Sequence, residues 1–282
     1  MSSRTTRSVF AGLAVIFFIA APMFLAMWSL ATIEGRTASE RLGYRLSDVR
    51  TAHAPVPRVF LKRLPRELPT ISSVKERKSL FIRILLPLIL QVNEDILEDR
   101  KRLIALQRQL ATGAGLADRD RKWLSGLAAA YRVKDGDLDE LVLRVDVIPP
   151  SLALAQAAIE SGWGTSRFAQ QANALYGQWT FDGSGIVPGR RDDGRKHRIK
   201  AFPRLLQSVS EYARNLNRHA AYARLRAVRA QLRASGTARG VKLAETLLSY
   251  SERGALYVSD LRTIILSNHF LDFDRSGLEK PA

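Results

Sequence analysis

A short apolar segment with well-marked ends constrains the fold of this chain more than any other feature. Pro149 and Pro150 suit the first turn of a helix, and residues 152–159 are apolar or small with high helix propensity. Gly162, with a second glycine two residues later, is typical of a helix C-terminus. The pattern therefore predicts an almost wholly apolar helix that carries Glu160 in its last turn.

Glu160 is chemically out of place at that position. The helix dipole puts partial negative charge at this end of a helix, and apolar surroundings disfavour an ionised carboxylate. Both effects raise the pKa of a carboxyl group, as a general acid working near neutral pH requires. The alternative is a solvent-exposed glutamate at a frayed helix end, because local inconsistency only suggests a functional site.

The residues after Glu160 form a long ordered motif. A Glu-Ser-Gly-Trp-Gly turn at 160–164 is followed by Ser-Arg-Phe-Ala at 166–169 and by Asn-Ala-Leu-Tyr-Gly-Gln-Trp at 173–179. This run resembles the glucosaminidase domain of glycoside hydrolase family 73, and within it the Bax-type subgroup. The resemblance covers roughly residues 140–270, with weaker similarity back to residue 56. It implies a lysozyme-like fold that hydrolyses the glycan strands of peptidoglycan, with Glu160 as the catalytic acid.

The expected fold class is mainly α (α+β). A lysozyme-like helical domain with a small β-hairpin lobe is expected, preceded by an N-terminal transmembrane helix and an extra helical region. The expected divisions are a transmembrane anchor or signal segment at 1–33, a linker or stalk at 34–68, a helical N-terminal extension packed on the catalytic domain at 69–145, and the glucosaminidase-like catalytic domain at 146–275.

Apolar spacing, glycines and prolines predict the elements within these divisions. They are a buried helix at 78–90 kinked at Pro87, an amphipathic helix at 91–110, helices at 118–131 and up to Leu143, short strands within 176–202, and helices at 206–218, 241–250 and 255–267.

The N-terminus predicts insertion into a membrane. Residues 9–33 carry no charge, and about twenty such residues already span a bilayer. The apolar region of a cleaved signal peptide is usually about 7–15 residues long, which favours an uncleaved anchor; export after cleavage near residues 29–31 is the alternative. Arginines flank both ends, so charge does not decide the orientation. A peptidoglycan substrate would place the catalytic domain outside the inner (cytoplasmic) membrane, on its periplasmic side.

Composition excludes several other classes. The chain has no cysteine, which rules out disulfides and thiolate metal sites, and its four histidines are scattered without metal-ligand spacing. We therefore expect no metal and no cofactor. The net charge of +17 would suit nucleic acid, but the cations are spread along the chain without a recognition motif. An anionic wall polymer or a solvated arginine-rich surface would explain the charge equally well.

Glycoside hydrolysis normally uses two carboxyl groups, and the second is not evident from the sequence. The family that this chain resembles often places a glutamate on the β lobe, and none occurs between Glu160 and Glu211. Asp192 and Asp193, or Asp182, are the available candidates, although the first two could equally lie in a solvated loop. The 2-acetamido group of the substrate could take the place of a second carboxylate.

Aromatic and amide side chains near the motif are candidates for substrate binding. The resemblance assigns Tyr250 a role in positioning substrate or stabilising charge; Tyr257, in the same segment, could instead be a core tyrosine. The remaining candidates are Trp163, which could instead be wedged under the helix end, Asn173, expected to cap the following segment, and Tyr176, Gln178 and Trp179.

The preferred function is a membrane-anchored peptidoglycan hydrolase of endo-β-N-acetylglucosaminidase type. A lytic transglycosylase or muramidase would use the same glutamate, although the turn typical of transglycosylases does not match residues 173–179. A non-catalytic peptidoglycan-binding scaffold is the alternative from another class, and the missing glutamate of the β lobe favours it. A nucleic-acid binder would leave the anchor unexplained.

Overall fold

The computed structural model describes residues 37–180, 184–187, 198–235 and 240–281. The chain divides into two compact units, residues 1–43 and residues 44–282.

The described part of the first unit is helix α2 (Ala38–Leu42). Its N-terminus carries a capping box in which the Thr37 hydroxyl accepts from the Glu40 amide and the Glu40 side chain accepts from the Thr37 amide. Gly43 ends the helix in the left-handed conformation. The expected membrane segment, residues 9–33, lies outside the described residues. None of the helices that are described is long and apolar enough to cross a membrane.

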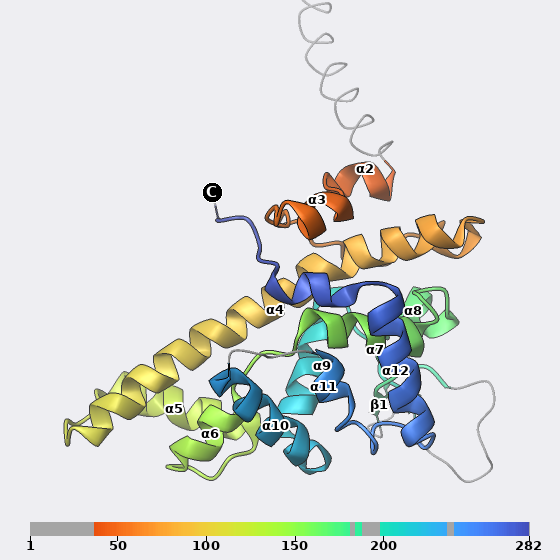
Figure 1. Cartoon of the computed structure of the whole chain (residues 1–282). Coiled ribbons are helices and arrows are strands. Elements are labelled where there is room, and N and C mark those ends of the chain that lie inside the picture. The colour runs from red at the N-terminus through yellow and green to blue at the C-terminus, as the bar shows by residue number, and fades with distance from the viewer. Residues whose placement is uncertain (1–36, 181–183, 188–197, 236–239, 282) are drawn as a thin grey trace, which may run out of the picture. The chain divides into compact units, whose positions relative to one another are not determined.

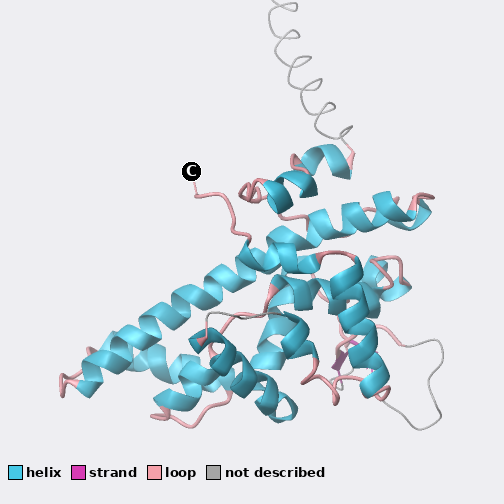
Figure 2. Ribbon diagram, viewed as in Figure 1, coloured by secondary structure: helices cyan, strands magenta, loops and turns pink. Residues whose placement is uncertain are grey.

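The described residues of the second unit are mainly helical, as expected, with one small antiparallel pair of strands among them (Figures 1 and 2). Its elements are α3 (Leu46–Thr51), η1 (Leu68–Thr70), α4 (Val74–Ala111), α5 (Asp118–Tyr131), α6 (Leu138–Arg144), α7 (Pro150–Ser161), α8 (Arg167–Ala172), β1 (Trp179–Thr180), β2 (Arg198–Ile199), α9 (Leu205–Arg218), η2 (Ala220–Tyr222), α10 (Ala223–Ala234), α11 (Gly240–Ala244), α12 (Ala255–Ser267) and η3 (Phe270–Arg275).

Helix α7 is the predicted apolar helix, and other helices enclose it. It packs against α4, α11, α12 and η3 (Figure 1). Leu152, Leu154 and Ala155 on it are fully buried. At its first turn, the Ser151 amide and hydroxyl both donate to the Asp274 carboxylate of η3, each at 2.8 Å. Because a helix that is apolar all round is stable only inside a core, this packing explains the composition of α7.

Helix α4 runs through both helical segments expected at 78–90 and 91–110, with Pro87 inside it. A proline has no N–H, so the carbonyl of Arg83, four residues earlier, lacks its usual partner within the helix. The Tyr44 hydroxyl donates to that carbonyl at 2.9 Å. This contact satisfies the carbonyl, and α4 continues past the proline along α7 and α9.

Residues 44–68, expected as part of a linker or stalk, belong to the same compact unit as the helices that follow. The extended backbone at Val56 pairs with the C-terminal segment, since the Val56 amide donates to Gly277 O and the Glu279 amide donates to Val56 O, each at 2.9 Å. Val56, Leu64 and Leu68 are buried. The prolines of this segment therefore accompany extended backbone that is packed on the unit.

Other element boundaries agree with the sequence to different degrees. Helices α5 and α12 span the predicted residues, and α9 begins one residue earlier than predicted. The helix predicted at 241–250 is wrong, because α11 ends at Ala244 and turns follow it. The Thr246 hydroxyl donates to the Leu243 carbonyl at 2.6 Å, a local bond that competes with continuing the helix. The sequence analysis did not identify α8 and α10.

The β lobe is represented by β1 and β2. They pair antiparallel with Trp179 opposite Ile199, and Ile186 forms a further antiparallel bridge to Ile199. The candidate residues Asp182, Asp192 and Asp193 lie outside the described residues.

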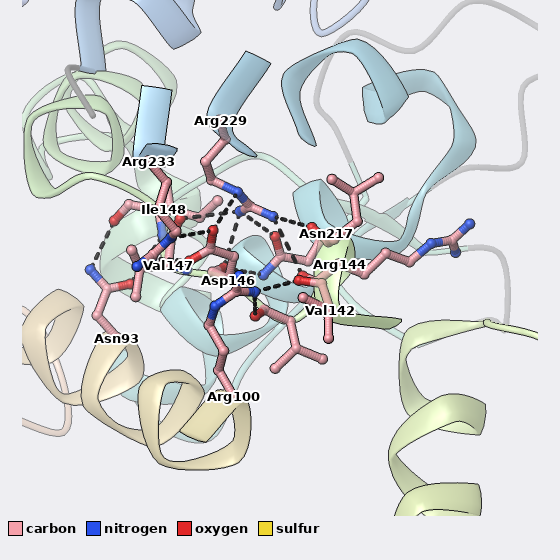
Figure 3. A network of polar contacts seen from close by, with 12 residues as sticks. Asn93, Arg100, Val142, Arg144, Asp146, Val147, Ile148, Asn217, Arg229 and Arg233 are labelled. Carbon is pink, nitrogen blue, oxygen red and sulfur yellow. Dashed lines mark hydrogen bonds and ion pairs between the residues drawn. The ribbon is translucent and has the colours of Figure 1, made fainter. Parts of the chain in front are cut away.

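A buried polar network fixes the segment that leads from α6 into α7 (Figure 3). Asp146, only 2 % exposed, accepts two hydrogen bonds from Arg233, and the Arg229 Nε lies 3.6 Å from its carboxylate. Arg229 also donates to the backbone carbonyls of residues 143, 144, 146 and 147, and Arg100 donates to those of residues 142 and 145. Buried carbonyls need partners, and these arginines supply them at the C-terminal end of α6.

Candidate active site

The end of α7 holds Glu160 in its last turn, as the sequence predicts. Gly162 is left-handed with φ 57°, and its amide donates to the Ile159 carbonyl at 3.3 Å. The Trp163 amide reaches back to the Ala158 carbonyl at 2.9 Å. Together these two bonds form a Schellman motif, which depends on the left-handed glycine and ends the helix at Ser161.

The turn after Glu160 is packed tightly against the core. The Gly164 amide donates to the Ser161 hydroxyl at 2.8 Å, and Gly164 itself is left-handed with φ +78°. A Cβ at Gly164 would lie 2.7 Å from Leu68 Cδ2 and 2.9 Å from Phe81 Cδ2. Only glycine fits both the conformation and the space, so this position holds the turn against η1 and α4.

The side chain of Glu160 lines a cleft of about 650 Å³. The lining comes from α7, the segment around β1, the end of α9, η2 and the turn before α12. The lining residues are Glu160, Tyr176, Gly177, Gln178, Trp179, Asn215, His219, Tyr222, Tyr250, Ser251, Glu252 and Arg253. Gly177 passes close to the carboxyl group, since a Cβ there would lie 3.4 Å from Glu160 Oε2.

The surroundings raise the pKa of Glu160 above that of an ordinary glutamate. Burial is the main cause, and a hydrogen bond from Tyr257 and the positive charge of Arg253 oppose it. A glutamate that keeps its proton to higher pH can donate it to a leaving group near neutral pH. The structure therefore shows the raised pKa that the sequence predicts for Glu160, and its role as the catalytic acid stays a prediction.

Aromatic rings form a continuous wall beside Glu160. The rings of His219 and Tyr222 are 5.8 Å apart, those of Tyr222 and Tyr250 are 6.0 Å apart, and Tyr250 stacks on Tyr257 at 5.5 Å. The Tyr250 hydroxyl donates to the Tyr176 carbonyl at 3.4 Å, which ties this wall to the segment before β1. Tyr222 and Tyr250 present aromatic surface to the cleft, where the apolar face of a sugar ring could pack.

The structure brings some of the predicted catalytic and substrate-binding residues together in one cleft. Among the predicted site residues, the cleft is lined by Glu160, Tyr176, Gln178, Trp179 and Tyr250. Tyr257 is buried behind this lining and acts on Glu160 through its hydroxyl group.

Two predicted binding residues lie elsewhere. Trp163 packs between Phe81 and Phe270, with ring centroids 5.8 and 6.1 Å away, so it has the wedging role that was the alternative. Asn173 is fully buried and ends α8 in the left-handed conformation. Its backbone amide donates to the Phe168 carbonyl of α8, so Asn173 caps the preceding helix and not the following segment as expected. Its side-chain amide donates to the Phe202 carbonyl at 2.8 Å.

The cleft also contains residues that the sequence analysis missed. Ser251, Glu252 and Arg253 directly follow Tyr250, and that proximity was the available signal. Asn215, His219 and Tyr222 come from the end of α9 and from η2, which no motif marks. Among the described residues, no cluster of histidine and acidic side chains could hold a metal ion.

Comparisons with known proteins identify the family of this chain. The glucosaminidase family, described as mannosyl-glycoprotein endo-beta-N-acetylglucosaminidase, matches residues 138–269. The protein bax of Escherichia coli K12 is 34% identical over 202 residues, which cover 69% of this chain and 71% of that protein. The catalytic domain of the autolysin Auto from Listeria monocytogenes is 17% identical, with a TM-score of 0.36, over 60% of this chain and 96% of that domain; a likeness of this size adds no argument. On the match to the Escherichia coli protein, this chain belongs to the Bax-type glucosaminidase family.

Proposed function

We propose that the chain is a peptidoglycan hydrolase of endo-β-N-acetylglucosaminidase type with a lysozyme-like catalytic fold. The observation that carries this proposal is Glu160 at the end of α7, with a raised pKa and a cleft beside it that aromatic rings line. Membership of the glucosaminidase family supports the reaction class.

In the proposed reaction, Glu160 gives its proton to the glycosidic oxygen as the bond from that oxygen to the anomeric carbon breaks. Positive charge then develops on the sugar ring, and a water molecule adds to the anomeric carbon. The proton of that water passes to a base, either the Glu160 carboxylate or a second group. A second group must assist the departure of the leaving group or activate the water. The candidates are Asp192, Asp193 and Asp182, the cleft residue Glu252, and the acetamido oxygen of the substrate itself.

We also propose that residues 9–33 anchor the protein in the inner membrane, with the catalytic unit outside the cytoplasm. The length of the uncharged stretch supports this anchor, and a substrate that exists only outside the cytoplasm supports the orientation.

The experiment is digestion of purified peptidoglycan by the full-length chain, followed by mass spectrometry of the new reducing ends. N-acetylglucosamine ends support the proposal, N-acetylmuramic acid ends would make the protein a muramidase, and anhydro ends would make it a transglycosylase. Glu160→Gln should reduce turnover by about a hundred- to ten-thousand-fold, the usual contribution of general acid catalysis. Glu98→Gln, the same change at an exposed α4 residue outside the cleft, is the matched control.

The same assay tests substitutions of the carboxylates that could serve as the second catalytic group. If a protein carboxylate assists, one of Asp182→Asn, Asp192→Asn, Asp193→Asn or Glu252→Gln will lose activity nearly as severely as Glu160→Gln. If the acetamido group assists, all four will keep appreciable turnover and Tyr250→Phe will be the more damaging change. Normal turnover in Glu160→Gln, or no cleavage by the wild type, would refute the proposed function.

A further inference from the structure

A file of buried polar side chains runs from α9 through α7 to the carboxyl group of Glu160. The Tyr212 hydroxyl donates to Gln156 Oε1 at 2.7 Å, and Gln156 Nε2 donates to the Tyr257 hydroxyl oxygen at 3.1 Å. Tyr257 in turn hydrogen bonds to Glu160. Gln156 lies one helical turn before Glu160, so both side chains are on the same face of α7.

The members of this file are held rigidly. Gln156 is 0% exposed, and Tyr212 and Tyr257 are each 1% exposed. Tyr212 stacks on Tyr176 with ring centroids 3.8 Å apart and 7° between the planes. Tyr257 stacks on Tyr250 with 6° between the planes. A buried amide or hydroxyl that loses its hydrogen-bond partner bears the full cost of desolvation. The arrangement in which every one of these groups is hydrogen bonded is therefore strongly favoured in free energy.

The orientation of the Gln156 amide decides the direction of every bond in the file. A tyrosine hydroxyl has one proton to donate. Because Tyr212 donates to the oxygen of the amide, the NH₂ group of Gln156 faces Tyr257 and donates to it. The proton of Tyr257 is then left for Glu160. With the amide reversed, Tyr257 would donate to Gln156, and Glu160 would lose this donor.

We propose that Tyr212, Gln156 and Tyr257 form a one-way hydrogen-bond relay that fixes Tyr257 as a donor to Glu160, which makes Gln156 and Tyr212 positioning residues for the catalytic acid. This role rests on the proposed function of Glu160. The relay holds one carboxyl oxygen in place and leaves the proton to be carried by the other.

The relay also limits how far burial raises the pKa of Glu160. The hydrogen bond from Tyr257 favours the carboxylate, and Arg253 acts in the same direction. The other titratable groups that face or adjoin the carboxyl group are Tyr212, Tyr222 and Tyr250, with His219 and Glu252 on the cleft lining. Loss of the donor at Tyr257 should therefore move the pKa of Glu160 upward.

The test uses Tyr212→Phe in the full-length chain, which keeps the ring stacked on Tyr176 and removes only the hydroxyl. Without it the Gln156 amide can reverse. We expect kcat to fall about tenfold, as for the loss of one hydrogen bond to a charged group, with KM within about twofold because Tyr212 does not line the cleft. The alkaline limb of the kcat/KM profile should move to higher pH. Gln156→Met offers Tyr257 no amide oxygen to donate to, so Tyr257 should keep donating to Glu160 and the alkaline limb should stay where it is in the wild type.

Tyr131→Phe is the matched control, since Tyr131 is a buried tyrosine outside the cleft. It should leave both kinetic constants and the pH profile unchanged. A merely structural role of Tyr212 would lower stability without moving the alkaline limb.

Carbon-13 NMR titration of glutamate carboxyl groups provides a readout that needs no activity. The Glu160 signal is the one missing from Glu160→Gln, and its pKa should be higher in Tyr212→Phe than in the wild type. An unchanged pKa and alkaline limb in Tyr212→Phe would overturn the relay, even if Gln156→Met fails to fold. If the wild type cleaves no glycan, the proposed function is refuted. The NMR titration would still show whether Tyr212 controls the pKa of Glu160, and so would still test the relay.

Discussion

Replacement of Asp146 by asparagine should destabilise the chain strongly, although the residue lies outside the cleft. The carboxylate is 2% exposed and is shared by Arg233 and Arg229. Arg229 is equally buried, and burial lowers its pKa to about 10 even with Asp146 beside it. The substitution keeps the shape of the side chain but leaves the Arg229 cation without an opposite charge, with Arg100 and Arg233 nearby.

The expected magnitude follows from that environment. Breaking a buried ion pair by removing one partner costs about 3–5 kcal/mol. Asparagine can still accept the hydrogen bond from the Val147 amide, which spans 2.8 Å in the wild type, so we expect about 3 kcal/mol. For a unit of this size each kcal/mol lowers the melting temperature by about 2–4 °C, and the expected loss is roughly 6–12 °C.

The assay is thermal unfolding of the full-length chain in detergent, followed by far-UV circular dichroism and calorimetry. Asp118→Asn is the matched control, because its carboxylate is 93% exposed and, within the described residues, pairs with the exposed Arg121. Such surface pairs contribute about 0–1 kcal/mol, so this variant should melt within about 4 °C of the wild type. Equal melting temperatures for Asp146→Asn and the wild type would show that the network of Figure 3 does not hold α6, α7 and α10 together through this charge.

Two further predictions concern the turn after Glu160 and the N-terminus. Gly164→Ala should cost about 2–4 kcal/mol of stability, from left-handed strain plus the clash with Leu68 and Phe81, whereas Gly136→Ala has the strain alone (φ +85°, open space) and should cost about 1–2 kcal/mol. Chemical denaturation measures the free energy of unfolding of both variants. Equal losses would show that the clash with Leu68 and Phe81 does not contribute. If residues 9–33 are an uncleaved span, the protein should fractionate with membranes, resist extraction by high salt or alkali, and be digested by protease added from outside. A mature N-terminus near Thr32, or protection of the catalytic unit in spheroplasts, would contradict that topology.

The sequence by itself determined the features that local chemistry controls. The prolines before α7 and Gly162 after it fix both ends of that helix, and they place Glu160 in its last turn. Helices α5 and α12 likewise follow from apolar spacing and turn residues. The motif around Glu160 was long enough to indicate the family, because its glycines and aromatic residues occur in a fixed order.

Tertiary structure decided everything that depends on residues far apart in the chain. Gln156 meets a tyrosine 101 positions away, and no local pattern shows that Tyr257 turns its hydroxyl toward Glu160. The end of α11 at Ala244 was also missed, and so was the joining of the helices expected at 78–90 and 91–110 into the single helix α4. Continuation through the proline depends on the Tyr44 hydroxyl, which replaces a bond within the helix. Helix signals in the sequence are local, whereas a buried polar group is satisfied by whatever the fold brings to it, and that partner is set by packing.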